Sequence, residues 1–125
     1  MNRQSLVDRI LETENLTSNL DDSDADVLLK WGIAQVDELI KNVGTNQAAD
    51  DRINQLMGVM REVNAWAGDP VSATPNAIIN LKTQYLQLLG SREKVNEDDA
   101  HEMIRRLSKM APHDSLMSIL TWLNE

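Results

Sequence analysis

The 125-residue sequence contains no cysteine, and aromatic residues make up only 3% of it. Without cysteine, the chain can form neither a disulfide framework nor a cysteine-based zinc site, and a thiol nucleophile is excluded. The five glycines are scattered, and the spacing of a phosphate-binding loop does not occur. These absences remove several common routes to catalysis and to cofactor binding.

Long apolar runs are also missing. No stretch approaches the roughly 20 apolar residues that a membrane-spanning helix needs. Asp8, Arg9 and Glu12 interrupt the segment in which the apolar core of a secretory signal would lie. We therefore expect a soluble, cytoplasmic protein that does not associate with membranes.

Charge is strongly biased toward one sign. The net charge is −8, and residues 1–75 hold 13 acidic but only 6 basic residues. An acidic surface repels phosphate backbones, so we do not expect nucleic acid as a partner. The composition, with 42% apolar and 26% charged residues, is typical of a globular protein, and the length fits one domain over residues 1–125.

Apolar residues recur at helical spacing through most of the chain, and no strand-like alternation is evident. The pattern predicts six helices, over residues 5–15, 23–43, 46–67, 75–89, 97–110 and 114–124. Short connectors favour antiparallel neighbours. The expected fold class is all-α: a single-domain bundle of five to six mostly antiparallel helices.

The helix over 23–43 has the most regular pattern. Its expected core stripe is Leu29, Ile33, Val36, Ile40 and Val43. Gly32, inside this helix, costs about 1 kcal/mol relative to alanine. We therefore expect a neighbouring helix to approach closely at this glycine.

Two helix starts carry clear signals. Thr74 followed by Pro75 is typical of an N-cap with proline at the first helical position, and Asn96 is the expected N-cap of the helix over 97–110. The helix over 75–89 has apolar residues on two faces, including Ile79 on the second, so we expect it to be the most buried helix.

The candidate metal ligands are Asp98, His101 and Glu102, which share one face of the helix over 97–110. Helical bundles do hold metals with carboxylate and histidine elements on facing helices. A second such element is missing here, so a solvated polar face is the preferred interpretation and no cofactor is expected. The alternative function is a small helical-bundle metal- or nucleotide-binding protein, or a hydrolase, that uses this face.

An acidic run, Asp22, Asp24 and Asp26, has the spacing of the first ligands of a calcium loop. The sixth and twelfth loop positions hold Val27 and Ile33 instead of the glycine and glutamate that the loop requires. We interpret the run as the negatively charged start of a helix, complementing the helix dipole.

Four apolar residues lie off the core stripes of their helices: Trp31, Val27, Trp122 and Met117. Such residues form either a second core face or an exposed anchor for a partner. With no nucleophile–base arrangement in the sequence, the preferred prediction is a non-enzymatic protein–protein interaction or regulatory module. The expected partner is another protein or a second copy of this chain.

Overall fold

The computed structural model describes residues 3–41, 46–69 and 73–125, and all regular elements within these ranges are helices. In chain order, these residues form α1 (Arg3–Glu12), α2 (Asp22–Lys41), α3 (Asn46–Gly68), α4 (Pro75–Leu88), α5 (Glu97–Leu107) and α6 (Pro112–Leu123). The helices pack against one another, so the expected all-α bundle is confirmed.

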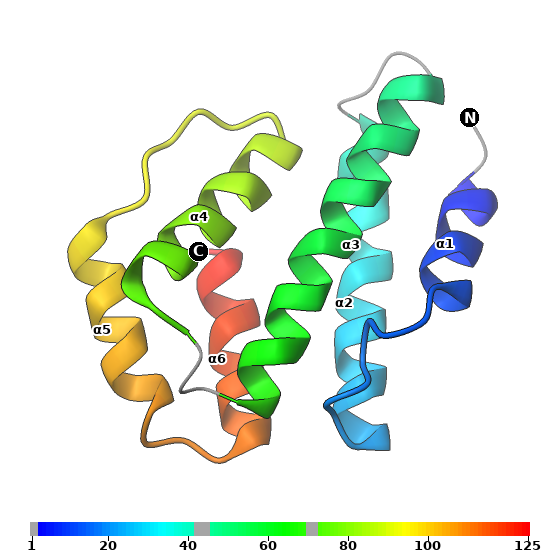
Figure 1. Cartoon of the computed structure of the whole chain (residues 1–125). Coiled ribbons are helices and arrows are strands. Elements are labelled where there is room, and N and C mark those ends of the chain that lie inside the picture. Colours follow the sequence, from blue (N-terminus) through cyan, green and yellow to red (C-terminus); the bar gives the residue numbers. More distant parts are fainter. Residues whose placement is uncertain (1–2, 42–45, 70–72) are drawn as a thin grey trace.

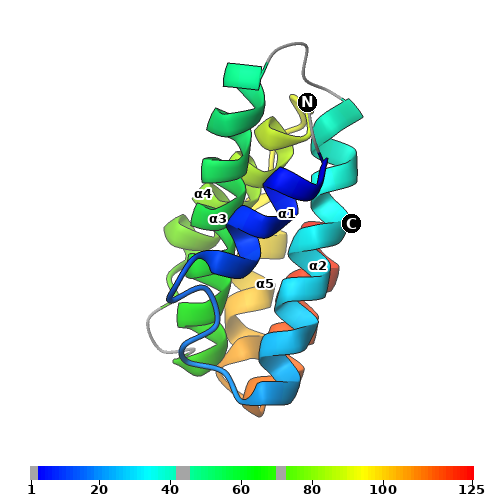
Figure 2. The same ribbon diagram turned by 90° about the vertical axis from the view of Figure 1, so that its right-hand side faces the viewer.

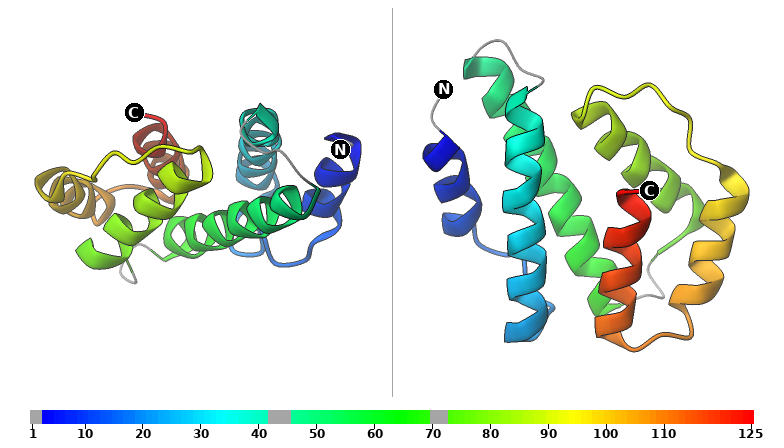
Figure 3. Two further views of the ribbon diagram at one scale, coloured as in Figure 1. Left: turned by 90° about the horizontal axis from the view of Figure 1, so that it is seen from above. Right: turned by 180° about the vertical axis from the view of Figure 1, so that it is seen from behind.

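The helices form two layers with one helix at each end. Successive helices run in roughly opposite directions (Figure 1). Seen from above, α3 and α4 lie in one layer and α2 and α6 in the other, while α1 and α5 lie at opposite ends (Figure 3). Because α2 and α6 run in the same direction, their N-termini lie at the same end of the bundle.

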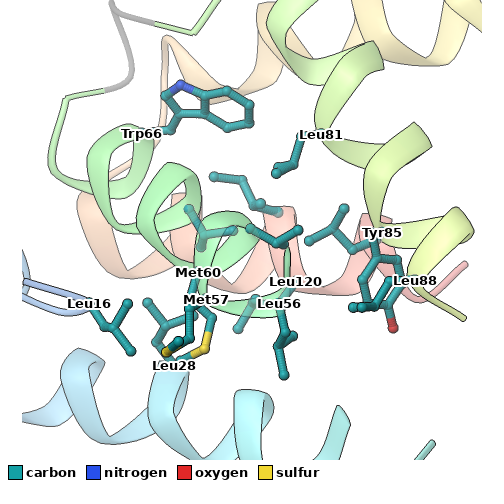
Figure 4. Packing of buried hydrophobic residues seen from close by; sticks show 14 of the residues in the cluster. Leu16, Leu28, Leu56, Met57, Met60, Trp66, Leu81, Tyr85, Leu88 and Leu120 are labelled. Carbon is teal, nitrogen blue, oxygen red and sulfur yellow. The ribbon is translucent and has the colours of Figure 1, made fainter. Parts of the chain in front are cut away.

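The hub of the bundle is α3. It packs against α1, α2, α4 and α6, and α1 crosses over both α2 and α3 (Figure 2). Buried side chains continue along most of its length, among them Leu56, Met57, Met60 and Trp66 (Figure 4). The prediction that the helix over 75–89 is the most buried is wrong: α4 buries five of its 14 residues, whereas the shorter α6 buries six of 12, and Ile79 on the second apolar face of α4 stays partly exposed.

Close approach at Gly32 is confirmed. A Cβ atom added to this residue would lie 2.6 Å from Sδ of Met60, well inside van der Waals contact. The glycine therefore lets α3 approach the backbone of α2. By contrast, a Cβ atom at Gly58, also inside a helix, would meet nothing within 4 Å.

The buried face of α2 is broader than expected and centred elsewhere. The fully buried apolar side chains are Leu28, Val36 and Leu39. Leu29, Ile33 and Ile40 are only partly buried, and Val43 lies outside the described residues. Because α2 packs against α1, α3 and α6, three neighbours decide which side chains are covered.

The two predicted N-caps are confirmed. The Thr74 side chain accepts a hydrogen bond from the Ala77 N–H at 3.2 Å, and Asn96 accepts bonds from the N–H groups of Asp98 and Asp99. Both caps satisfy backbone donors that have no partner inside the helix.

Other helix ends differ from expectation. The first helix ends at Glu12, near Asn15, whose φ of 69° is left-handed and cannot continue a helix. The Asp21 side chain accepts the hydrogen bond from the Asp24 N–H in the first turn of α2. Pro112 begins α6, two residues before the expected start at residue 114, because proline is compatible with the first helical turn.

Candidate functional site

An open groove between α5 and α6 contains one of the two exposed large apolar side chains among the described residues. Met117 is 42% exposed and lies beside a hollow of about 200 Å³. The wall also includes Met103, Arg106, Trp122 and Glu125. Methionine is flexible and polarisable, so it adapts to partner surfaces of different shape.

Trp122 lines this groove but is not an exposed anchor. It is only 3% exposed, so the hypothesis of an exposed tryptophan fails at this position. Nζ of Lys82 lies 4.5 Å from the centre of its ring and donates a hydrogen bond to its carbonyl oxygen at 2.8 Å. Large aromatic side chains bury a great deal of apolar area, and Trp122 is buried in the hydrophobic core.

Trp31 links α2 to the end of α6. Its Nε1 donates a hydrogen bond to Oδ1 of Asn124 at 2.8 Å, and its ring centre lies 5.5 Å from that of Tyr85. The side chain is half-buried, as is Val27 one turn earlier. Trp31 therefore packs against Tyr85 and Asn124, and part of its surface stays exposed.

The same junction continues into the core as a network of uncharged hydrogen bonds. The Tyr85 hydroxyl donates to Oε1 of Gln35 at 2.7 Å and accepts from Nδ2 of Asn124 at 2.7 Å. Burial raises the pKa of the Tyr85 hydroxyl to about 12, so it stays protonated at neutral pH. The network joins α2, α4 and the C-terminal end of α6.

A charged pair joins the other ends of α2 and α6. Nδ1 of His113 lies 2.5 Å from Oδ1 of Asp24, whose side chain is 5% exposed, whereas that of His113 is 57% exposed. The hydrogen bond and the charge of Asp24 raise the pKa of His113, with smaller contributions from Asp114 and Asp21. The two residues are 89 positions apart, so no local motif could have predicted this pair.

An Asp–His pair could orient an imidazole for catalysis, but it would also need a nucleophile on the other ring nitrogen. Among the described residues, no side chain forms a hydrogen bond to Nε2 of His113. The Ser115 hydroxyl, two positions away, is fully buried and has no hydrogen-bond partner there. Among the described residues, the pair therefore has no nucleophile within hydrogen-bond distance of its free ring nitrogen.

The candidate metal ligands Asp98, His101 and Glu102 are all exposed on α5. Glu102 forms an ion pair with Arg105 on the same helix, at 2.5 Å. In the part of the chain that the structure describes, no three histidine, aspartate or glutamate side chains are grouped so that they could hold a metal ion. The side chains of Asp22, Asp24 and Asp26 therefore do not form a metal site either.

The helices of the described ranges also lack the combination of length and apolarity that a bilayer crossing requires. No protein-family model, curated protein or solved structure matches the chain. Its function therefore has to be argued from its own side chains.

Proposed function

We propose that this chain is a non-enzymatic protein-binding module and that Met117 anchors its partner. The observation that carries the proposal is the exposure of Met117 beside the groove between α5 and α6. Residues that dominate binding energy are anchors packed into pockets from which water is excluded, and an exposed apolar side chain next to a hollow can supply such a contact. The acidic character of the whole chain would add long-range attraction to a basic partner surface.

The rim of the groove adds polar specificity. Arg106 is exposed, and within the described ranges its guanidinium group has no ion-pair or hydrogen-bond partner. Glu125 lies on the same rim. A partner would therefore place an apolar side chain on Met117 and could add a charge-assisted hydrogen bond at either rim residue. A second copy of the chain is one form of such a partner.

The test compares two exposed apolar residues on different helices, Met117 on α6 and Leu11 on α1. Leu11 is 53% exposed and serves as the matched control for Met117. Analytical ultracentrifugation of Met117→Asp and Leu11→Asp measures self-association. A photo-crosslinking amino acid at position 117 or 11, introduced in cells, detects a different protein partner.

We expect Met117→Asp to weaken association about tenfold or more, because anchor residues contribute about 2 kcal/mol or more. Leu11→Asp should leave it unchanged. Equal effects of the two substitutions, or crosslinking at neither position of a chain that is also monomeric, would contradict the proposal.

A further inference from the structure

A larger hollow than the one beside Met117 lies on a different part of the surface, between α4 and the segment that leads to α5. Its volume is about 410 Å³, within the roughly 300–1,000 Å³ range of small-molecule sites. The connecting segment arches from the end of α4 to the start of α5 (Figure 1). Ile79, Thr83 and Gln87 form the helical wall, and residues 91–95 form the other.

Hydrogen bonds anchor both ends of this connecting segment. At its start, Gly90 has a φ of 78°, and the Ser91 N–H donates to the Leu86 carbonyl at 2.8 Å. The Ser91 hydroxyl then accepts a bond from the Glu93 N–H at 3.2 Å. At its end, Asn96 caps α5. The hollow is therefore bounded by a segment whose ends are fixed, as a preformed site requires.

Each wall of the hollow contributes one apolar side chain. Ile79 and Val95 pack against the core but are only partly buried, and both line the hollow. Ile79 belongs to the second apolar face of α4, which the other helices do not fully cover. An apolar group placed there would bury surface that is now exposed.

The rim carries positive charge on a chain whose net charge is −8. Arg92 and Lys94 both line the hollow, and neither has an ion-pair or hydrogen-bond partner within the described ranges. Elsewhere, five basic side chains form ion pairs with carboxylates. Glu93, between the two bases, limits the local excess to a single positive charge.

From these observations we infer that the hollow between α4 and residues 91–95 binds a small apolar carboxylate. The apolar part of the ligand lies on Ile79 and Val95, and its carboxylate accepts charge-assisted hydrogen bonds from Arg92 and Lys94. Glu93 favours a ligand with one negative charge over a polyanion, because it repels any further negative charge.

The experiment is a titration of the isotope-labelled full chain, followed by NMR, with three probes that share one apolar tail: octanoate, octanol and octylamine. We expect octanoate to bind with a dissociation constant of about 1 mM, in keeping with its small number of atoms. Its shifts should cluster at residues 79–95. Octanol should bind several-fold more weakly and octylamine more weakly still.

Two double variants make the test specific. Arg92→Gln with Lys94→Gln should weaken octanoate binding about fivefold or more at low salt, because both charge-assisted hydrogen bonds are lost. The control is the double variant Arg61→Gln with Lys109→Gln, which removes the same number of positive charges. Both residues are exposed and do not line the hollow. The control should bind octanoate as the wild type does.

Three results would overturn the inference. The first is no shift with 10 mM octanoate, and the second is a set of shifts centred elsewhere on the chain. The third is a failure of either comparison: the three probes bind equally well, or both double variants weaken binding equally. Either outcome would show that Arg92 and Lys94 do not recognise the carboxylate.

Discussion

The two ends of α6 are joined to α2 by different chemistry. At the C-terminal end, uncharged groups form the network of Trp31, Asn124, Tyr85 and Gln35. At the N-terminal end, the ionisable pair of His113 and Asp24 spans the same two helices. The stability of the first junction should be constant around neutral pH, whereas that of the second should depend on pH.

The difference follows from burial and from the ordinary pKa values of the groups. Tyr85 is almost fully buried and would need a pH near 12 to ionise. His113 is more than half exposed, and its pKa is raised from an ordinary value of 6.5. The C-terminal end of α6 is thus held by hydrogen bonds that do not change around neutral pH, and its N-terminal end by an ion pair whose strength depends on pH.

The largest expected effect comes from breaking the uncharged junction. Tyr85→Phe keeps the ring but leaves Oε1 of Gln35 without its donor and removes the acceptor of Asn124. We expect the free energy of unfolding to fall by about 1–3 kcal/mol, the cost of leaving buried polar groups unpaired. Urea unfolding followed by circular dichroism measures this loss. The loss should be the same at pH 6 and pH 9, and a pH-dependent loss would contradict the comparison.

A smaller effect is expected at the outer part of the same network. Asn124→Ala removes the acceptor of the Trp31 indole and the donor to Tyr85. Because Asn124 is exposed, water can replace part of what is lost. Urea unfolding should show a loss of about 1 kcal/mol, the usual net value of such bonds. A loss larger than that of Tyr85→Phe would mean that Asn124, rather than Tyr85, organises the junction.

The ionisable junction should give a pH-dependent effect that is smaller still, because exposure of His113 allows solvent to screen the pair. A pKa raised by folding means that the folded state binds the proton more tightly than the unfolded state does. The stabilisation is therefore complete below pH 6.5 and is lost as pH rises through the folded-state pKa of His113.

Thermal unfolding between pH 5.5 and 9 tests this sign. His113→Asn should remove the decline in melting temperature with rising pH. The chain has only two histidines, and His101→Asn, on the exposed face of α5, is the matched control that should keep the decline. If both variants behave alike, the pair with Asp24 does not produce the pH dependence.

The smallest effect is expected at Ser115, close to His113 in the chain. Its hydroxyl is fully buried and has no hydrogen-bond partner among the described residues, so Ser115→Ala removes an unpaired polar group and also favours the helix. Urea unfolding should show a change of no more than about 0.5 kcal/mol, or a gain in stability. A loss above about 1 kcal/mol would show that the hydroxyl has a partner, such as a buried water molecule.

The sequence predicted the helices well because the signals for a helix, apolar spacing and capping residues, lie within the helix or directly beside it. Apolar spacing located all six elements, and Thr74 and Asn96 marked two starts correctly. The errors at the end of the first helix and at the start of the last one also have local causes, since Asn15 and Pro112 are residue types compatible with more than one position at a helix end. Composition likewise indicated a helical globular chain without thiol chemistry.

The candidate sites were much less predictable. The off-stripe positions of Trp31, Trp122 and Met117 were visible in the sequence, but their different degrees of exposure were not. Whether an off-stripe side chain is covered depends on which helices pack beside it. Linear spacing within one helix does not contain that information.

By itself, therefore, the sequence determined the fold class, the approximate extent of each helix and the excess of negative charge. Only the tertiary structure decided that Trp122 is buried and Met117 exposed, that His113 meets Asp24, and that Arg92 and Lys94 flank a hollow. The physical reason is distance along the chain. Helical periodicity acts over a few residues, whereas burial and pairing depend on contacts between helices far apart in sequence.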